Sequence, residues 1–129
     1  MTETRWLALV HVLAIHSDQI KTHGGSAGLR DRGLLESASE RPKNQFHYGS
    51  DPDLASLAAA YGFGLANNHP FVDGNKRVAF QAMYLFLGLN GFRIEAPEEE
   101  VVSLILSLAA GELDETELAD WVRRHITPR

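Results

Sequence analysis

The sequence contains no cysteine and no long apolar run. Without cysteine the chain cannot form disulfides or cysteine-ligated zinc sites, a composition that fits a reducing cytoplasm. No window approaches the roughly 20 apolar residues that a membrane-spanning helix requires. The N-terminal segment has an acidic residue before its first arginine and no small-residue cleavage site, so it does not resemble a signal peptide. We therefore expect a cytoplasmic protein that does not bind membranes.

Positive charge is missing from one long segment. Nine of the 17 acidic residues lie between Glu95 and Asp120, a span without Lys or Arg, and the net charge is −5. Such a surface repels phosphate backbones, so we expect no direct nucleic-acid binding by this chain alone. The basic residues gather elsewhere, at Arg30, Arg32, Arg41 and Lys43 and again at Lys76 and Arg77.

The remaining composition is that of a single globular domain. At 129 residues, with an apolar fraction of 44%, the chain is long enough for one core and too short for two. It has no internal repeat, low-complexity tract or linker, and its apolar residues recur mostly at helical spacing. The sequence thus predicts one all-α domain over residues 1–129, a compact bundle of about six helices around a buried central helix.

Helix boundaries in the first half are predicted from caps and breakers. The first helix is expected from Glu3 to Lys21, and the three glycines of "HGGSAGLRD" end it. Asp31 is the predicted N-cap of a short helix that ends near Glu40, before Pro42. The segment Lys43–Ser50 would then be an extended flap or hairpin.

The next two helices have clear end signals. Asp51 as N-cap and Pro52 at the first helical position would open a helix that ends near Asn67. A further helix is expected from Asn75 to Asn90–Gly91. Because this helix is apolar on nearly all sides, it should be the central, buried one.

Two helices are predicted near the C-terminus. Pro97 and the three glutamates after it begin the first, since negative charge suits a helix N-terminus. Asp114 and Glu117 have the spacing of a capping box at the start of the last helix. The stretch "FRIEAP" would precede both as a short extended connection.

The segment "NHPFVDGNKRVAF" concentrates polar side chains directly before the predicted central helix. The first N–H groups of a helix lack partners within it and carry partial positive charge, so they can bind an anion. Gly74 allows close approach to the backbone. Lys76 and Arg77 add two positive charges that oppose the helix dipole, which is favourable if a polyanion binds there. A phosphate chain is the obvious candidate.

Side chains on this loop could supply chemistry to a bound phosphate. Asp73 is a natural ligand for Mg²⁺, which takes one or two carboxylates with phosphate oxygens and water. His69 could remove the proton from a hydroxyl that attacks phosphorus. Asn75 could orient the carboxylate or a phosphate, and Phe71 should point inward and hold the loop on the core. Two structural alternatives stay open: Asp73 could only cap the helix, and a lone histidine is more often structural than catalytic.

The motif "HPFVDGNKR" closely resembles the signature loop of the Fic/Doc family, and in particular of its Doc (death on curing) branch. The resemblance extends to "GGSAGLRD", "ASERP" and "LFLGLNGFRI" in the expected order, and so spans roughly Ile15 to Ile126. It implies an all-α Fic/Doc fold and the nucleotide-dependent modification of a protein hydroxyl.

The resemblance also implies roles for individual residues. His69 would be the general base, Asp73 would bind Mg²⁺, and Phe71 would be the structural anchor of the loop. The segment Lys43–Ser50 would be the flap that aligns the target. The residues implied to bind the phosphates of ATP are Gly74, Asn75, Lys76 and Arg77. The resemblance implies that the catalytic residues are His69, Asp73, Lys76 and Arg77.

Two positions separate this chain from Fic proteins that transfer AMP. Lys76 stands where those proteins have a second glycine, and Phe80 where they have a second arginine. In Doc proteins the same change accompanies transfer of the γ-phosphoryl group of ATP to a threonine of elongation factor Tu, which stops translation. The resemblance therefore implies a protein kinase toxin of a toxin–antitoxin module. The alternatives are an AMP or nucleotidyl transferase and a non-enzymatic Doc-like regulatory binding module.

The sequence also lacks any Glu-Gly or Glu-Asn dipeptide, and with it the self-inhibitory motif of many Fic proteins. An active toxin without that motif needs inhibition by another protein. The resemblance implies a small Phd-like antitoxin whose C-terminal segment folds onto the toxin. Its contact surfaces could include an apolar groove among the outer helices and the four basic residues Arg30, Arg32, Arg41 and Lys43.

Overall fold

The computed structural model describes residues 3–49 and 52–129, which fold into six helices and a two-stranded sheet. The elements are α1 (Leu9–His23), α2 (Arg32–Tyr48), α3 (Leu54–Asn68), α4 (Asn75–Leu89), β1 (Phe92–Ile94), α5 (Glu98–Ala109), α6 (Glu115–His125) and β2 (Ile126–Pro128). The prediction of an all-α bundle is confirmed. Within the described ranges, no helix is long and apolar enough to cross a bilayer.

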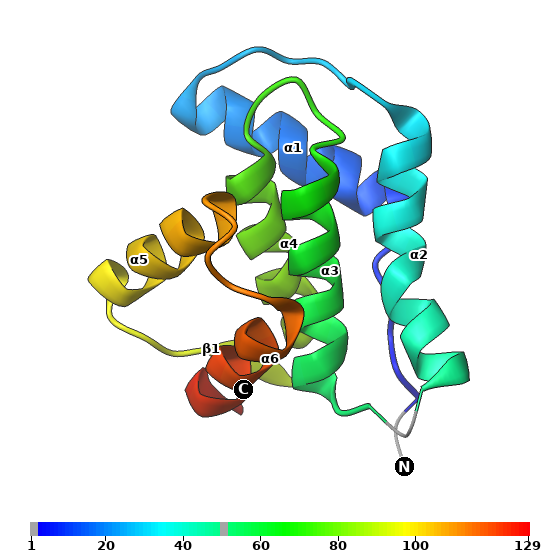
Figure 1. Cartoon of the computed structure of the whole chain (residues 1–129), viewed down its shortest axis with the longest axis vertical. Helices are drawn as coiled ribbons and strands as arrows, with labels where there is room; N and C mark the ends of the chain where they lie inside the picture. Colours follow the sequence, from blue (N-terminus) through cyan, green and yellow to red (C-terminus); the bar gives the residue numbers. More distant parts are fainter. Residues whose placement is uncertain (1–2, 50–51) are drawn as a thin grey trace.

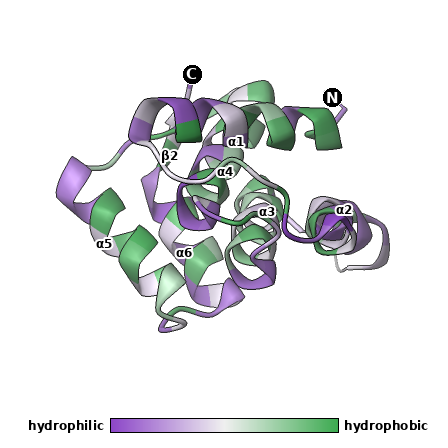
Figure 2. Cartoon of the chain, turned by 90° about the horizontal axis from the view of Figure 1, so that it is seen from above, coloured by the Kyte–Doolittle hydropathy of each residue, from purple (hydrophilic) through white to green (hydrophobic). Residues whose placement is uncertain are grey.

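α3 and α4 lie side by side in the middle of the molecule (Figure 1). Seen from above, α1, α2, α5 and α6 are arranged around this pair (Figure 2). The hydrophobic core lies where α3 packs against α4, α2 and α6, since these are its most extensive contacts. The loop that carries the predicted site joins the two central helices and is therefore attached to the best-packed part of the fold.

α3 is the most deeply buried helix because many of its side chains are small. Ten of its 15 residues are buried. A Cβ added at Gly62 would lie 2.5 Å from Sδ of Met83 on α4, and one at Gly64 would lie 3.4 Å from Cα of Ala38 on α2. Glycine at these two positions lets the neighbouring helices approach the α3 backbone closely.

α4 starts and ends where the sequence predicts, and it shares the central position with α3. Seven of its residues are buried, but Tyr84, Leu85 and Leu89 on its outer face are 44%, 39% and 36% exposed. Apolar side chains lie on all sides of α4, but the neighbouring helices cover only part of its surface. Some of these side chains therefore remain exposed. The chain reverses after α4 at Gly91, which has φ +89.

The predicted start of the first helix at Glu3 is wrong, because α1 begins at Leu9. The segment before it is bonded to other elements and not to itself. The amide of Leu7 donates to the buried Tyr61 hydroxyl at 3.0 Å, and the amide of Arg5 donates to Oδ1 of Asn90 at 2.9 Å. These partners replace the intrahelical bonds that a longer α1 would have required.

The predicted flap over Lys43–Ser50 is also wrong, because α2 continues through Pro42 to Tyr48. The N-cap prediction is confirmed, since Oδ1 of Asp31 accepts from the amide of Leu34 at 3.0 Å. Proline normally interrupts a helix. Here Pro42 belongs to the buried face of α2, and the packing of that face against α3 outweighs the lost hydrogen bond.

The start of α3 differs from the prediction in a similar way. Pro52 precedes the helix, and the N-cap is Asp53, whose Oδ1 accepts from the amide of Ser56 at 2.8 Å. The predicted cap Asp51 lies outside the described residues, as does Ser50 at the end of the predicted flap.

α5, α6 and β1 agree with the prediction, whereas the strand β2 was not predicted. α5 follows Pro97, and the capping box of Asp114 and Glu117 at the start of α6 is confirmed. The predicted extended stretch contains β1, which pairs antiparallel with β2 so that Phe92 lies opposite Pro128.

Candidate active site

The predicted site loop connects α3 to α4 at the upper end of the molecule in Figure 1, where the link between α1 and α2 passes over it. The main chains of loop and link are hydrogen-bonded to each other. The amide of Val72 donates to the Gly28 carbonyl at 3.0 Å. The Pro70 carbonyl accepts from the amides of Arg30 and Asp31 at 2.7 and 3.0 Å. The link therefore forms one wall of the candidate site.

The side chain of Asn75 is hydrogen-bonded to the backbone of the loop. Its Oδ1 accepts from the amide of Phe71 and its Nδ2 donates to the Phe71 carbonyl, both at 2.9 Å. Both polar ends of this side chain are thus engaged by the loop backbone. Within the described ranges, the main-chain amide of Asn75 remains available to a phosphate, as does the second N–H of its Nδ2.

Phe71 points into the core and is 2% exposed. Its ring stacks on His16 of α1, with ring centroids 3.8 Å apart and planes 6° from parallel. Nε2 of His16 lies 2.9 Å from the Asp73 carbonyl, and because a carbonyl only accepts, this nitrogen carries the proton. His16 thus contacts the loop at two points, a role that nothing in the local sequence indicates.

His69 follows α3 directly and has a left-handed backbone, with φ 49 and ψ 55. It is the single non-glycine residue with positive φ among those described. This conformation costs an ordinary residue about 1–2 kcal/mol. The side chain is exposed to solvent at the surface of the loop. Helices often end in a left-handed residue, but glycine usually occupies that position, so a histidine here needs support from its surroundings.

The N-terminus of α4 lacks a side-chain cap, as do those of α1 and α5, whereas α2, α3 and α6 are each capped by an aspartate. Its N-cap is Gly74, with φ +80. The first amide that donates within this turn is that of Val78, to the Gly74 carbonyl at 3.0 Å. Among the described residues, the amides of Asn75, Lys76 and Arg77 have no partner.

In the structure Asp73 does not form a capping bond with the first turn of α4. Its Oδ1 accepts from the amide of Gly74 at 2.9 Å, and its Oδ2 from the amide of Ser26 at 3.4 Å. The exposed carboxylate therefore lies between the link and the uncapped helix end. Within the described residues, no group of three or more His, Asp or Glu side chains could hold a metal ion.

The two basic residues of the motif differ in their surroundings. Lys76 is exposed, whereas Arg77 is half-buried, with Nη2 donating to the Gly24 carbonyl at 3.2 Å. The Nε atom of Arg77 is buried and has no partner in the described part of the chain. A Cβ added at Gly74 would lie 3.6 Å from Nη2 of Arg77, so this guanidinium lies beside the helix end.

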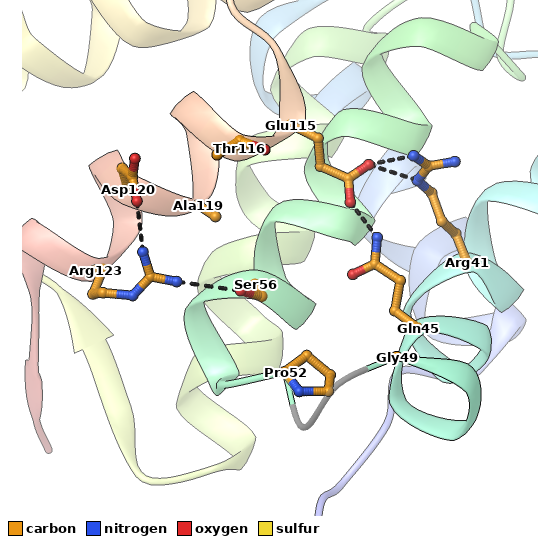
Figure 3. A pocket seen from close by; sticks show the side chains of 10 residues that line it. All are labelled: Arg41, Gln45, Gly49, Pro52, Ser56, Glu115, Thr116, Ala119, Asp120 and Arg123. Carbon is orange, nitrogen blue, oxygen red and sulfur yellow. Dashed lines mark hydrogen bonds and ion pairs between the residues drawn. The ribbon is translucent and has the colours of Figure 1, made fainter.

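A cleft of about 540 Å³ lies at the other end of α3 and is lined by α2, α3 and α6 (Figure 3). Its charged side chains are already paired with each other. Arg41 and Gln45 bind Glu115 on one wall, while Arg123 binds Asp120 on the other. We therefore regard this cleft as a junction between helices and not as the active site.

Three of the four basic residues considered as antitoxin contacts have side-chain partners within the chain. Arg41 belongs to the cleft, and Arg30 lies at the site loop, where its guanidinium binds the carbonyls of Asn68 and His69. Arg32 forms an exposed ion pair with Glu36 on the same helix. The role of Arg30 at the loop could not be found from local sequence, because its partners are 38 and 39 residues away.

The sequence of this chain is similar to those of known proteins. The model of the Fic/DOC family matches residues 6–87. "Protein kinase doc" of Escherichia phage P1 is 32% identical over 121 residues, which cover 93% of this chain and 94% of that protein. "Toxin Doc" of Mycolicibacterium smegmatis (strain ATCC 700084 / mc(2)155) is 47% identical over 75 residues, 57% of each chain. The family match covers more than half of this chain and includes the whole site loop, so the chain belongs to the Fic/DOC family.

Proposed function

We propose that this chain is a Doc-type toxin that transfers the γ-phosphoryl group of ATP to a hydroxyl of a translation factor. The observation that carries the proposal is the uncapped N-terminus of α4, where three amides without partners in the described part of the chain lie next to two basic side chains. Such a site is complementary to a chain of phosphates. His69 and Asp73 lie on the loop that leads into it.

In the proposed reaction, His69 accepts the proton of the target hydroxyl. The hydroxyl oxygen then forms a bond to the γ-phosphorus, while the bond between that phosphorus and the bridging oxygen breaks and ADP leaves. The main chain at Gly74 and the amides of Asn75, Lys76 and Arg77 hold the phosphates. The side chains of Lys76 and Arg77 offset their negative charge.

Asp73 fits the role of a magnesium ligand. Its carboxylate is exposed, and its two partners are both amide donors, so lone pairs remain for a cation. It is a single carboxylate, and Mg²⁺ commonly completes such a site with phosphate oxygens and water. The bound ion would neutralise charge on the phosphates.

Phosphoryl transfer is favoured over AMP transfer by the position of Phe80. Its ring is 8% exposed and belongs to the hydrophobic core, 6.4 Å from the ring of Tyr84. An apolar core residue thus occupies the position where a nucleotidyl-transferring Fic protein has its second arginine. A relative that aligns over most of the chain is itself named a protein kinase.

The toxin role is supported by the relative named "Toxin Doc". By the same reasoning we propose a threonine of elongation factor Tu as the target, a Phd-like antitoxin as the partner, and action in the cytoplasm. A non-enzymatic binding module is the second candidate. The intact set of His69, Asp73, Lys76 and Arg77 argues against it, since a module without activity would not require all four.

The proposal is tested with purified protein, Mg²⁺, and elongation factor Tu with its tRNA and nucleotide ligands. ATP labelled at the γ-phosphate should label the target, whereas ATP labelled at the α-phosphate should not. We expect His69→Ala to lower the rate by about 100-fold or more. His47→Ala, on the exposed surface of α2, is the matched control and should retain the wild-type rate.

Label from the α-phosphate would establish nucleotidyl transfer and contradict the interpretation of Lys76 and Phe80 as signs of phosphoryl transfer. If His69→Ala remains toxic when it is expressed in cells, both enzymatic hypotheses fail and the binding module is favoured.

A further inference from the structure

We infer that Arg30 is a positioning residue of the active site, which holds the main chain at the end of α3 so that the His69 imidazole is presented to the target hydroxyl. The inference rests on the proposed function, because it concerns the base of that reaction. It assigns Arg30 a role inside the toxin, in place of the antitoxin contact that its charge suggested.

Arg30 binds the carbonyls of three successive residues. Its Nε donates to the His69 carbonyl at 2.7 Å and its Nη2 to the Asn68 carbonyl at 2.9 Å. Its main-chain amide donates to the Pro70 carbonyl at 2.7 Å. These contacts fix the path of the backbone on both sides of the His69 Cα atom.

The end of α3 needs such a partner. The last carbonyls of a helix lack intrahelical donors, and a cation near them is favoured by the helix dipole. The last turn of α3 contains no basic residue. The Arg30 guanidinium, which comes from a distant part of the chain, supplies both the donors and the positive charge.

The backbone of His69 also needs support from its surroundings. Its φ of 49 places it in the left-handed region, which strains any residue with a side chain. Pro70 adds a second restriction, because a following proline disfavours helical conformations. The conformation persists where the neighbouring structure determines it, and the bond from Nε of Arg30 is made to the carbonyl of His69 itself.

The hydrogen bonds of Arg30 indicate that it positions the backbone and does not bind the substrate. Two of the donor nitrogens of Arg30 are engaged with main-chain oxygens, so its principal contacts are within the protein. We therefore expect Arg30→Ala to lower kcat by about 10- to 100-fold, the range for a displaced catalytic group, while KM for ATP stays close to the wild-type value. Methylguanidinium added to Arg30→Ala should restore part of the lost rate.

Arg32→Ala is the matched control. This neighbouring arginine pairs with Glu36 one turn along α2 at 3.0 Å, and its side chain is 62% exposed. The control removes the same charge from the same region and should keep the wild-type kcat. If Arg30→Ala does not fold, Arg30→Lys serves instead, because it keeps the charge but lacks the planar fork that reaches two carbonyls.

A structural measurement accompanies the kinetics. A residue with positive φ gives a strong NOE between its own amide and Hα protons. This signal from His69 should be present in the wild type and in Arg32→Ala, and it should weaken in Arg30→Ala. If it persists unchanged in Arg30→Ala, the inference is overturned whatever the activity.

The kinetic outcomes distinguish this inference from the proposed function. A wild-type chain that transfers no label would overturn the proposed function. An active wild type with an Arg30→Ala kcat within about twofold of Arg32→Ala would overturn the inference alone. A rise in KM without a fall in kcat would also overturn it, since Arg30 would then bind substrate.

Discussion

At the scale of single residues, the site depends on how closely the link between α1 and α2 approaches the loop. A Cβ added at Gly25 would lie 2.6 Å from Oδ2 of Asp73, too close for any real contact. The preceding Gly24 has a similarly unusual backbone, but a Cβ there would have nothing within 4 Å. The two glycines therefore differ in one respect: a side chain at Gly25 would collide with Asp73, the proposed magnesium ligand, and a side chain at Gly24 would not.

This difference predicts distinct effects of two similar substitutions. Gly24→Ala and Gly25→Ala should each destabilise the protein by about 1–3 kcal/mol, since both residues have a positive φ that side chains disfavour. Only Gly25→Ala should also displace the Asp73 carboxylate. We expect it to raise the Mg²⁺ concentration that gives half-maximal activity, as measured by a magnesium titration of label transfer. Equal magnesium dependence in the two variants would show that the carboxylate does not bind the ion.

The sequence predicts which residues lie on the site loop, but it does not predict which distant residues contact that loop. His69, Asp73 and Asn75 lie within a few positions of one another, so the motif alone is enough to place them on one loop. His16 and Arg30 lie far from the loop in sequence and are joined to it by tertiary packing. Nothing in their local sequence distinguishes them from an ordinary helix histidine and an ordinary surface arginine.

At the scale of elements, the N-terminal segment is fixed by a side chain of α3. The Tyr61 hydroxyl accepts from the amide of Leu7, and the ring is completely buried. Burial raises the pKa of Tyr61 to about 12. The folded state therefore keeps this hydroxyl protonated at a pH where the unfolded chain has begun to ionise it.

The raised pKa predicts how stability changes in alkali. The stability linked to Tyr61 is complete below its unfolded pKa of about 10 and is lost as the pH rises through the folded value. Tyr61→Phe should remove this loss. At neutral pH it should cost about 1 kcal/mol, because the Leu7 amide loses its partner. Urea unfolding between about pH 8 and pH 12 measures both effects.

The exposed Tyr84 provides the control for this experiment, since it is 44% exposed. Tyr84→Phe should follow the alkaline curve of the wild type. If Tyr61→Phe follows that curve as well, other groups cause the loss of stability in alkali.

The starts of α2 and α6 were predictable from their local caps, whereas the boundaries decided by packing were not. Asp31 and the capping box at Asp114 mark the starts of α2 and α6 because each acts on amides within its own turn. Pro42 suggested a break, but the contact of α2 with α3 continues past it. The late start of α1 likewise depends on partners in α3 and α4 that the local sequence does not indicate.

At the scale of the whole molecule, α6 is joined to the rest of the bundle by ion pairs around the cleft in Figure 3. Arg123 binds Asp53 through Nε at 2.7 Å and through Nη2 at 3.0 Å. Its hydrogen bonds hold the pKa of Asp53 well below the usual range. Asp53 is also the N-cap of α3, so one carboxylate serves both the helix and its contact with α6.

Asp53→Asn separates these two roles, because asparagine caps a helix about as well as aspartate. We expect it to lower the unfolding free energy at pH 7 by roughly 0.2–1 kcal/mol, the range for an exposed ion pair. A lowered pKa contributes stability above the unfolded value of about 3.9, and this contribution is lost as the pH falls toward the folded value. The difference between variant and wild type should therefore shrink in acid.

Denaturant unfolding of both proteins from about pH 7 down to pH 2 tests this expectation. Asp53→Ala should be less stable than Asp53→Asn at every pH, since it also removes the cap. A gap between Asp53→Asn and the wild type that persists unchanged in acid would exclude the ion pair as its cause.

The hydrogen bonds between the link and the site loop have a consequence for how the family is recognised. The groups that hold the loop from outside come from positions 38 to 57 residues earlier in the chain. A fragment that began after residue 31 would contain the whole nine-residue motif and none of these groups. The candidate site is therefore built from two separate parts of the chain, and the motif is only the second of them. Relatives that keep the motif but differ in the link can share the ancestry of this chain without sharing the geometry of its candidate site.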